Sequence, residues 1–197
     1  MLRDVINIIA ENARQIPYFN KVYTIARRFR DGNGKVFPAE YTGSGNGHEI
    51  AYDKTGGMAY FRKNGNASLR EDNSPKFTSC DSGVTYTITI PLKMVCFIPN
   101  NIAVCDDGFT GDEFAEKIIS ELTTEEISPN LSKLKSASLI CTGYDTDSVA
   151  VLEKEYSNAK DITDMNYNNA YFSIDFNIIV VVDKTCLNEC FNYGYNG

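Results

Sequence analysis

Apolar residues recur at helical spacing near the start of the chain. Between residues 2 and 16 they lie three or four positions apart, at Leu2, Val5, Ile6, Ile9, Ala13 and Ile16. Such a stripe is typical of an amphipathic helix that lies on a core. Pro17 follows the stripe and lacks the backbone N–H that a further helical turn requires. The pattern therefore predicts one helix that ends at Pro17.

A second helix is predicted from about residue 111 to residue 122. Thr110 and Glu113 have the spacing of a capping box, in which each side chain satisfies a backbone amide of the other residue. Apolar residues continue in helical register behind this box, at Phe114, Ile118 and Leu122. These two segments are the principal helices that the sequence predicts.

Two antiparallel hairpins are predicted from runs of β-forming residues. Residues 22–29 and 36–41 are separated by Asp-Gly and Asn-Gly pairs, which supply the positive φ of a tight turn. Residues 136–144 and 148–156 flank the short segment Asp145-Thr-Asp147. In that segment the aspartate side chains are expected to accept hydrogen bonds from nearby backbone amides, as they do in turns.

A longer strand is predicted to begin at Val84. Its apolar residues Val84, Tyr86, Ile88 and Ile90 alternate with threonines, so that one face is buried and the other meets water or a partner. The β-like pattern continues beyond Pro91 to Ile98. Pro91 indicates a bulge or an edge position, because a missing N–H is harmless there.

The last predicted strand, from Tyr171 to Val182, becomes apolar on both faces. One face carries an unbroken apolar row, made of Phe172, Ile174, Phe176, Ile178, Val180 and Val182. The other face changes from polar residues to Ile179 and Val181. A strand in an antiparallel sheet usually keeps one face wet, so this extra apolar surface must be covered by a helix, another sheet or another subunit. Ile179 and Val181 are therefore candidate subunit contacts.

The sequence predicts a single α+β domain over residues 1–197, with a mainly antiparallel β-sheet packed by two principal helices. Residues 43–83 are polar and rich in glycine, and they are predicted to form a long hairpin-like insertion or arm. Residues 184–197 are expected to form a C-terminal tail. Its aromatic residues are further candidate subunit contacts, because such side chains commonly anchor protein contacts: Phe191, Tyr193 and Tyr195.

Composition narrows the classes of function. The chain has 43% hydrophobic residues, enough for a sizeable core, and no run near the roughly 18 apolar residues of a membrane-spanning helix. Its net charge of −7 does not favour overall binding to the negatively charged backbone of a nucleic acid. Basic residues nevertheless gather at Arg27, Arg28 and Arg30. This patch is either solvated hairpin charge or a contact for an acidic neighbour or a phosphate backbone.

No motif predicts catalysis, a cofactor or a metal. The six cysteines are expected to be free thiols, and Cys186 and Cys190 have no second closely spaced pair with which to complete a zinc site. His48, the single histidine, lies in a glycine-rich polar segment without a predicted rigid frame. The paired aspartates are better explained as turn residues.

The order of the predicted elements resembles the tail terminator and head-tail completion proteins of tailed bacteriophages. The resemblance includes the strand entry Val36-Phe-Pro-Ala-Glu-Tyr41 and the last strand Ala170-Tyr-Phe-Ser-Ile-Asp-Phe, and it covers most of the chain except residues 43–83. The chain also looks similar to proteins of phages that infect anaerobic gut bacteria, including the crAss-like group.

This resemblance implies a non-enzymatic virion protein. Such a subunit would form a homo-oligomeric ring in the neck or tail, joining the portal and capsid to tail components after assembly in the host cytoplasm. The packaged DNA would pass through the lumen without specific binding, because an acidic wall repels the polymer. The resemblance implies no membrane partner.

Two other hypotheses remain open at this point. The first is a carbohydrate- or protein-binding module that uses aromatic residues of the insertion, such as Tyr52, Tyr60 and Phe61. The second is an enzyme that uses His48 or a pair of carboxylates.

Overall fold

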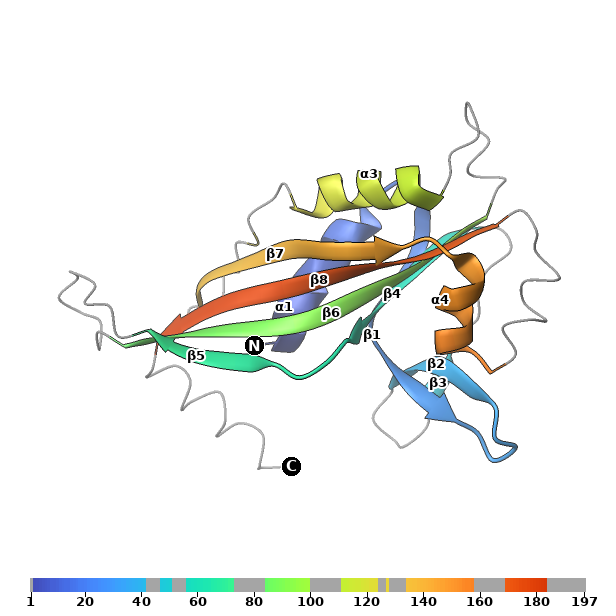
Figure 1. The fold of residues 1–197 in the computed structure, drawn as a ribbon, viewed down its shortest axis with the longest axis horizontal. Helices are drawn as coiled ribbons and strands as arrows, with labels where there is room; N and C mark the ends of the chain where they lie inside the picture. The colour runs from blue at the N-terminus through green and yellow to red at the C-terminus, as the bar shows by residue number, and fades with distance from the viewer. Residues whose placement is uncertain are drawn as a thin grey trace.

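The computed structural model describes residues 2–41, 47–50, 56–72, 84–99, 111–123, 127, 134–157 and 169–183. These residues form an α+β fold with an eight-stranded, mostly antiparallel sheet, which confirms the predicted fold class (Figure 1). The helices are α1 (Leu2–Arg14), α3 (Gly111–Thr123) and α4 (Ser148–Glu155). The strands are β1 (Phe19–Arg30), β2 (Val36–Tyr41), β3 (Gly47–Glu49), β4 (Gly57–Lys63), β5 (Ser68–Asp72), β6 (Thr85–Pro99), β7 (Leu134–Asp145) and β8 (Asn169–Asp183).

Two long strands form the centre of the sheet. The strand order is β3-β2-β1-β4-β6-β8-β7, and β5 pairs with the part of β6 that β4 leaves free. β6 and β8 are each 15 residues long and pair antiparallel along their whole length without a register shift. Because side chains alternate across a strand, the even-numbered residues of both strands share one face and the odd-numbered residues share the other.

The even-numbered face is covered by α1 and α3. Figure 1 shows α1 behind the sheet and α3 along its β7 side. The apolar stripe is buried as predicted from Val5 to Ile16, and so are Phe114, Ile118 and Leu122 of α3. The ring of Phe114 meets Tyr18 edge-on, with centroids 5.1 Å apart, and lies parallel to Phe172 of β8. Both predicted helices are confirmed, and the capping residue Thr110 lies outside the described residues.

On the odd-numbered face, α4 covers only the end of the sheet near Phe97 and Tyr171. Val151, Leu152 and Tyr156 pack there in a second, smaller core. Residues 148–156 were expected to form a strand, and this prediction is wrong, because Ser148–Glu155 are helical. The short run of apolar residues in this segment has a periodicity that fits a strand or a helix, and the N-terminal cap at Asp147 favours the helix.

The aspartates before α4 behave as the turn prediction requires. The Asp145 carboxylate accepts a hydrogen bond from the backbone N–H of Asp147 at 3.1 Å. The Asp147 carboxylate in turn accepts from the N–H of Ala150 at 3.1 Å and caps α4. One aspartate ends β7 and the next starts the helix.

The segment 43–83 does not stand apart from the domain in its described parts. β4 lies between β1 and β6, parallel to β1 and antiparallel to β6, and its residues Met58–Phe61 are buried. The description as an arm does not fit β4, which is an interior strand of the sheet, and β5 also pairs with β6. A strand buried on both faces is continuously apolar and lacks the alternation that marks a half-exposed strand. The rest of this segment and residues 184–197 lie outside the described residues.

Pro91 produces no bulge between β6 and β8. β5 pairs with residues 85–89 of β6 and β4 with residues 92–97, so Pro91 lies at the junction of the two shorter strands. Its carbonyl accepts a hydrogen bond from the N–H of Asn64 at 2.9 Å. In an extended residue the backbone N and O point to the same side, so the side of Pro91 that lacks an N–H faces this junction. The junction is a local edge of β6, and an edge position is one of the two alternatives that the sequence predicted for Pro91.

Replacing the capping residue should weaken α4 specifically. We expect Asp147→Ala to lower the free energy of unfolding by about 1 kcal/mol, because the N–H of Ala150 loses its acceptor. Urea unfolding followed by circular dichroism measures this change. Glu153→Ala, an exposed change in the same helix, is the control and should have almost no effect. Equal effects of the two changes would contradict the assigned cap.

Candidate functional site

Half of the odd-numbered sheet face has no cover among the described elements. α4 covers the other half, and Figure 1 shows the far part of β6, β8 and β7 without a helix in front of it. We call this surface the open half-face. It consists of Thr87 and Thr89 of β6, Ile179 and Val181 of β8, Ser136, Ser138 and Ile140 of β7, and Ser68 and Arg70 of β5.

Aliphatic and hydroxyl side chains lie side by side on the open half-face. Ile179 is directly opposite Thr89 on one side and Ser138 on the other. Val181 has Thr87 and Ser136 in the same positions. Ile140 of the edge strand is 47% exposed. The predicted contacts Ile179 and Val181 therefore lie together on this face, next to hydroxyl side chains of the neighbouring strands.

A buried ion pair separates the open half-face from the half that α4 covers. Lys93 of β6 is 9% exposed, and its Nζ lies 2.9 Å from the carboxylate of Asp175 on β8. The same Nζ donates to Ser173 Oγ at 3.2 Å, and Asn64 Nδ2 donates to Asp175 at 2.8 Å. A charge can lie this deep because several polar groups satisfy it. The pair ties β6 to β8.

A second buried ion pair fastens α4 to the sheet. Glu155 of α4 is 3% exposed, lies 3.0 Å from Arg62 Nη2 of β4, and accepts a hydrogen bond from the Tyr60 hydroxyl at 3.2 Å. Burial, followed by the negative charge of Glu155, raises the pKa of Tyr60 well above its usual value of 10.0. Arg62 and Lys93 are direct cross-strand neighbours, so each of these like charges is neutralised by a different carboxylate.

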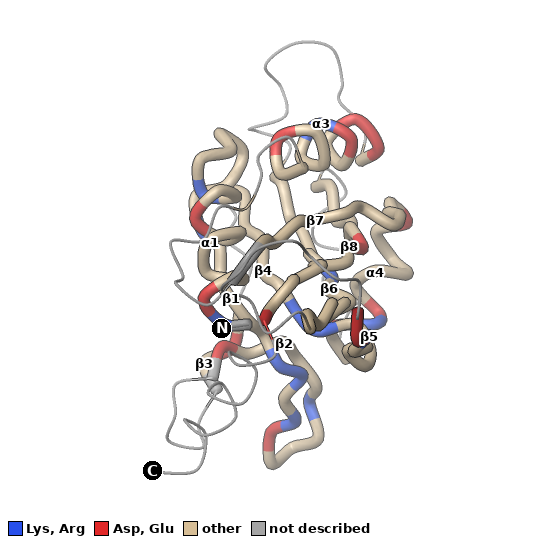
Figure 2. Tube along the Cα trace, turned by 90° about the vertical axis from the view of Figure 1, so that its left-hand side faces the viewer, with Lys and Arg blue, Asp and Glu red and all other residues tan. Residues whose placement is uncertain are grey.

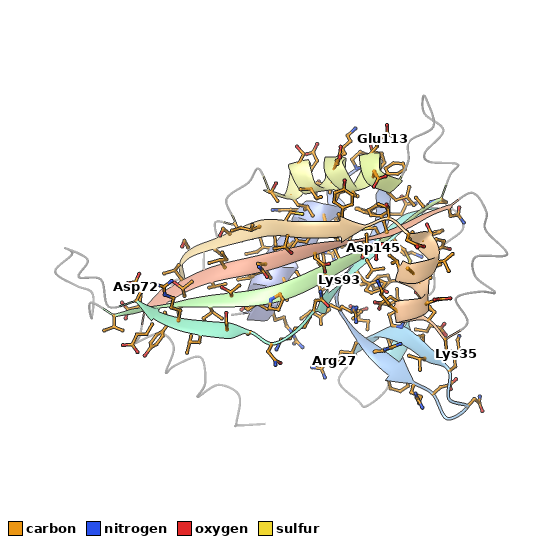
Figure 3. The ribbon with its side chains drawn as sticks, in the orientation of Figure 1. Arg27, Lys35, Asp72, Lys93, Glu113 and Asp145 are labelled. Atoms are coloured by element: carbon orange, nitrogen blue, oxygen red, sulfur yellow. The ribbon has the colours of Figure 1, made fainter. Side chains whose placement is uncertain are left out.

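A third ion pair joins the end of β7 to the last turn of α4, nearer to solvent. Lys154 Nζ donates to Asp145 at 3.0 Å, and this hydrogen bond is the main cause that lowers the pKa of Asp145. Figure 3 shows Lys93 and Asp145 close to this junction of sheet and helix. All three pairs join neighbouring elements, and each cation has its own carboxylate.

The described residues show no metal-binding cluster. No group of three or more His, Cys, Asp or Glu side chains converges within the ranges given above. His48 is exposed on the edge strand β3, in register with Glu40 of β2. Cys96 is fully buried, which raises the pKa of its thiol, and Cys141 is half-buried. Cys186 and Cys190 lie outside the described residues.

The predicted aromatic ligand surface is not exposed. Tyr60 is 1% exposed and Phe61 is 0% exposed, because β4 is an interior strand. Their assignment to a ligand-binding surface is therefore wrong, and Tyr52 lies outside the described residues. Phe191, Tyr193 and Tyr195 also lie outside them, so the predicted role of these three residues stays a prediction.

The predicted basic patch is exposed at the end of β1. Arg27 and Arg28 line a cleft of about 400 Å³ together with Arg62 and Lys63 of β4, and Arg30 lies farther along β1, toward the hairpin turn. Sequence reasoning missed Arg62 and Lys63. Their proximity to Arg27 and Arg28 follows from the pairing of β1 with β4, which no local pattern announces.

Comparison with models of known protein families gives no match, and comparison with curated proteins gives none either. None of the described helices has the length and apolar character needed to cross a membrane.

The ion pair between Arg62 and Glu155 should contribute strongly to stability. We expect Glu155→Gln to lower the free energy of unfolding by about 2 kcal/mol, because the half-buried Arg62 would remain beside Lys93 without its carboxylate. Denaturant unfolding measures the loss. Glu153→Gln removes an exposed carboxylate from the same helix and should change stability by less than about 0.5 kcal/mol. A similar small effect of Glu155→Gln would show that the pair contributes little.

Tyr60 should make the protein less stable at high pH. The folded state holds the pKa of Tyr60 above its unfolded value, so stability is complete below about pH 10 and falls as pH rises further. We expect Tyr60→Phe to cost about 1 kcal/mol at pH 7, where it loses a hydrogen bond to Glu155. The difference between the two proteins should shrink above pH 10. Thermal unfolding between pH 7 and pH 11 tests this, and parallel curves would contradict it.

Proposed function

We propose that the chain is a non-enzymatic structural subunit of a tailed-phage virion, which assembles with copies of itself into a ring in the neck or tail. The observation that carries this proposal is the open half-face. A long, flat part of the central sheet carries Ile140, Ile179 and Val181, and no described element covers it. The resemblance to tail terminator and head-tail completion proteins supports the same function.

The open half-face has the chemistry of a contact surface. Its aliphatic residues offer apolar area, while the threonines and serines keep the isolated subunit soluble. Sheets pack face to face through such rows of side chains, and helices also lie across them. The strands beneath are held by the Lys93–Asp175 ion pair, so the surface keeps its shape.

The proposed ring would join the portal and capsid to tail components. The net charge of −7 suits a wall along which packaged DNA slides without being held. The alternative of a carbohydrate- or protein-binding module has less support, because Tyr60 and Phe61 are buried in the sheet.

The first experiment is the solution mass of the purified chain. Light scattering behind size exclusion, with negative-stain imaging of large species, is expected to show closed rings in equilibrium with smaller species. A monomer at high concentration, both alone and with neighbouring virion proteins, would contradict the proposed function.

The open half-face should contribute to this assembly. We expect the double variant Ile179→Asp/Val181→Asp to raise the concentration needed for assembly at least about tenfold, since it places charge where apolar contacts form. The milder double variant Ile179→Thr/Val181→Thr is a second test in case the aspartates prevent folding, because threonine is favourable in a strand. Val149→Asp, at an exposed site on α4, is the control. Unchanged assembly of both double variants would contradict a role for this surface.

A further inference from the structure

A cleft opens where β1 and β4 separate. The two strands run parallel as far as the pair Ile25 and Phe61, and beyond it residues 26–30 of β1 pair only with β2 among the described strands. The space between the diverging strands has a volume of about 400 Å³. Its apolar part is formed by Ile6 of α1, by Ile25 and Ala26 of β1, and by Ile90 and Leu92 of β6.

Among the described residues, the charged side chains that line this cleft are all basic. The charged residues that line it are Arg27, Arg28, Arg62 and Lys63, and we call the whole the basic cleft. Arg62 is neutralised by Glu155. For the exposed Arg28 and Lys63, the structure gives no hydrogen bond or ion pair with any described residue. An adjoining hollow of about 250 Å³ adds Arg3 and one acid, Glu40.

An apolar floor with a basic rim fits glutamate side chains well. A glutamate carries its carboxylate on two methylene groups, so the stem can lie against isoleucine and leucine while the charge meets arginine or lysine. The lining of the basic cleft therefore favours an acidic protein surface as its partner. That surface must be narrow enough for its side chains to enter between the two strands. A single exposed helix meets that requirement.

The outer face of α3 has this character. Its exposed carboxylates are Asp112, Glu113, Glu116 and Glu121, and it has one lysine, Lys117, whose Nζ lies over the ring of Tyr18 at 5.4 Å. Figure 2 shows acidic segments on α3 at one end of the molecule and basic segments along the β1–β2 hairpin at the other. Figure 3 shows Glu113 above the β7 edge of the sheet and Arg27 below the sheet, near β1.

We propose that neighbouring copies join head to tail, with the acidic face of α3 of one copy seated in the basic cleft of the next. Because the two surfaces are unlike and do not overlap, each copy binds two neighbours, and such a heterologous contact closes into a ring when its rotation permits. This inference rests on the proposed self-assembly, but it does not depend on the open half-face.

A charge exchange between two variants tests this contact. The cleft variant carries Arg28→Glu and Lys63→Glu, and the helix variant carries Glu113→Lys and Glu116→Lys. Each variant alone brings like charges together at every contact, so we expect the concentration needed for assembly to rise at least about tenfold. In an alternating assembly with an even number of copies, an equimolar mixture restores opposite charges at every contact. We expect the mixture to regain the wild-type mass in light scattering.

Two controls separate this contact from a general charge effect. Arg30→Glu changes the charge of the same hairpin outside the cleft lining and should leave assembly nearly unchanged. Raising the salt concentration to about 1 M should weaken wild-type assembly, since screening acts on exposed charges and much less on apolar contacts. If a charge-reversed variant loses its circular dichroism signal, the neutral pair Arg28→Gln/Lys63→Gln replaces it, with a smaller loss expected.

The outcomes distinguish this inference from the proposed function. If both variants form rings as the wild type does, and the wild-type rings persist at high salt, the head-to-tail contact is overturned and the proposed ring function still stands. Variants that each fail to assemble, and that also fail as a mixture, would overturn the pairing of these two surfaces. A wild-type monomer under all conditions would contradict both proposals.

Discussion

The antiparallel pairing of β6 with β8 is the constraint on which the rest of the structure depends. Both strands are 15 residues long and stay in register throughout. Whether a residue has an even or an odd number therefore determines on which face of the sheet its side chain lies. A slip of β8 by one residue would move Phe172, Ile174 and Phe176 away from α1 and α3, and it would bury Asp175 in that apolar core without Lys93. The cost of burying an unpaired charge makes the observed register the stable one.

The odd-numbered face of this pair changes its character along β8. Tyr171 and Ser173 are buried, Asp175 holds Lys93, and Ile179 and Val181 lie on the open half-face. α4 ends at the polar middle zone, where Glu155 meets Arg62. α4 crosses the strands from Tyr171 of β8 toward Val36 of β2 and does not extend along β8. Ile179 and Val181 therefore lie beyond the part of the sheet that α4 covers.

Local patterns in the sequence predicted the elements whose burial is one-sided. α1, α3 and the β1–β2 hairpin each have the periodicity, cap or turn residues that mark them, and the apolar alternation of residues 171–182 marks β8 as a strand. β4 was missed because a strand buried on both faces has no alternation. The basic cleft was half predicted, from Arg27 and Arg28. Its other half, Arg62 and Lys63, joins them only through a parallel pairing of strands distant in sequence.

The sheet also determines how the two proposed surfaces lie relative to each other. α3 packs on the sheet through Phe114 and Ile118, and the basic cleft has Ile90 and Leu92 of β6 in its lining. Both surfaces are therefore fixed to the same paired strands, with no hinge between them in the described residues. A ring needs the same rotation at every contact, because a variable angle would give open chains of mixed curvature. The rigidity of the β6–β8 pair thus connects the fold to the proposed assembly: it sets a single angle between successive copies.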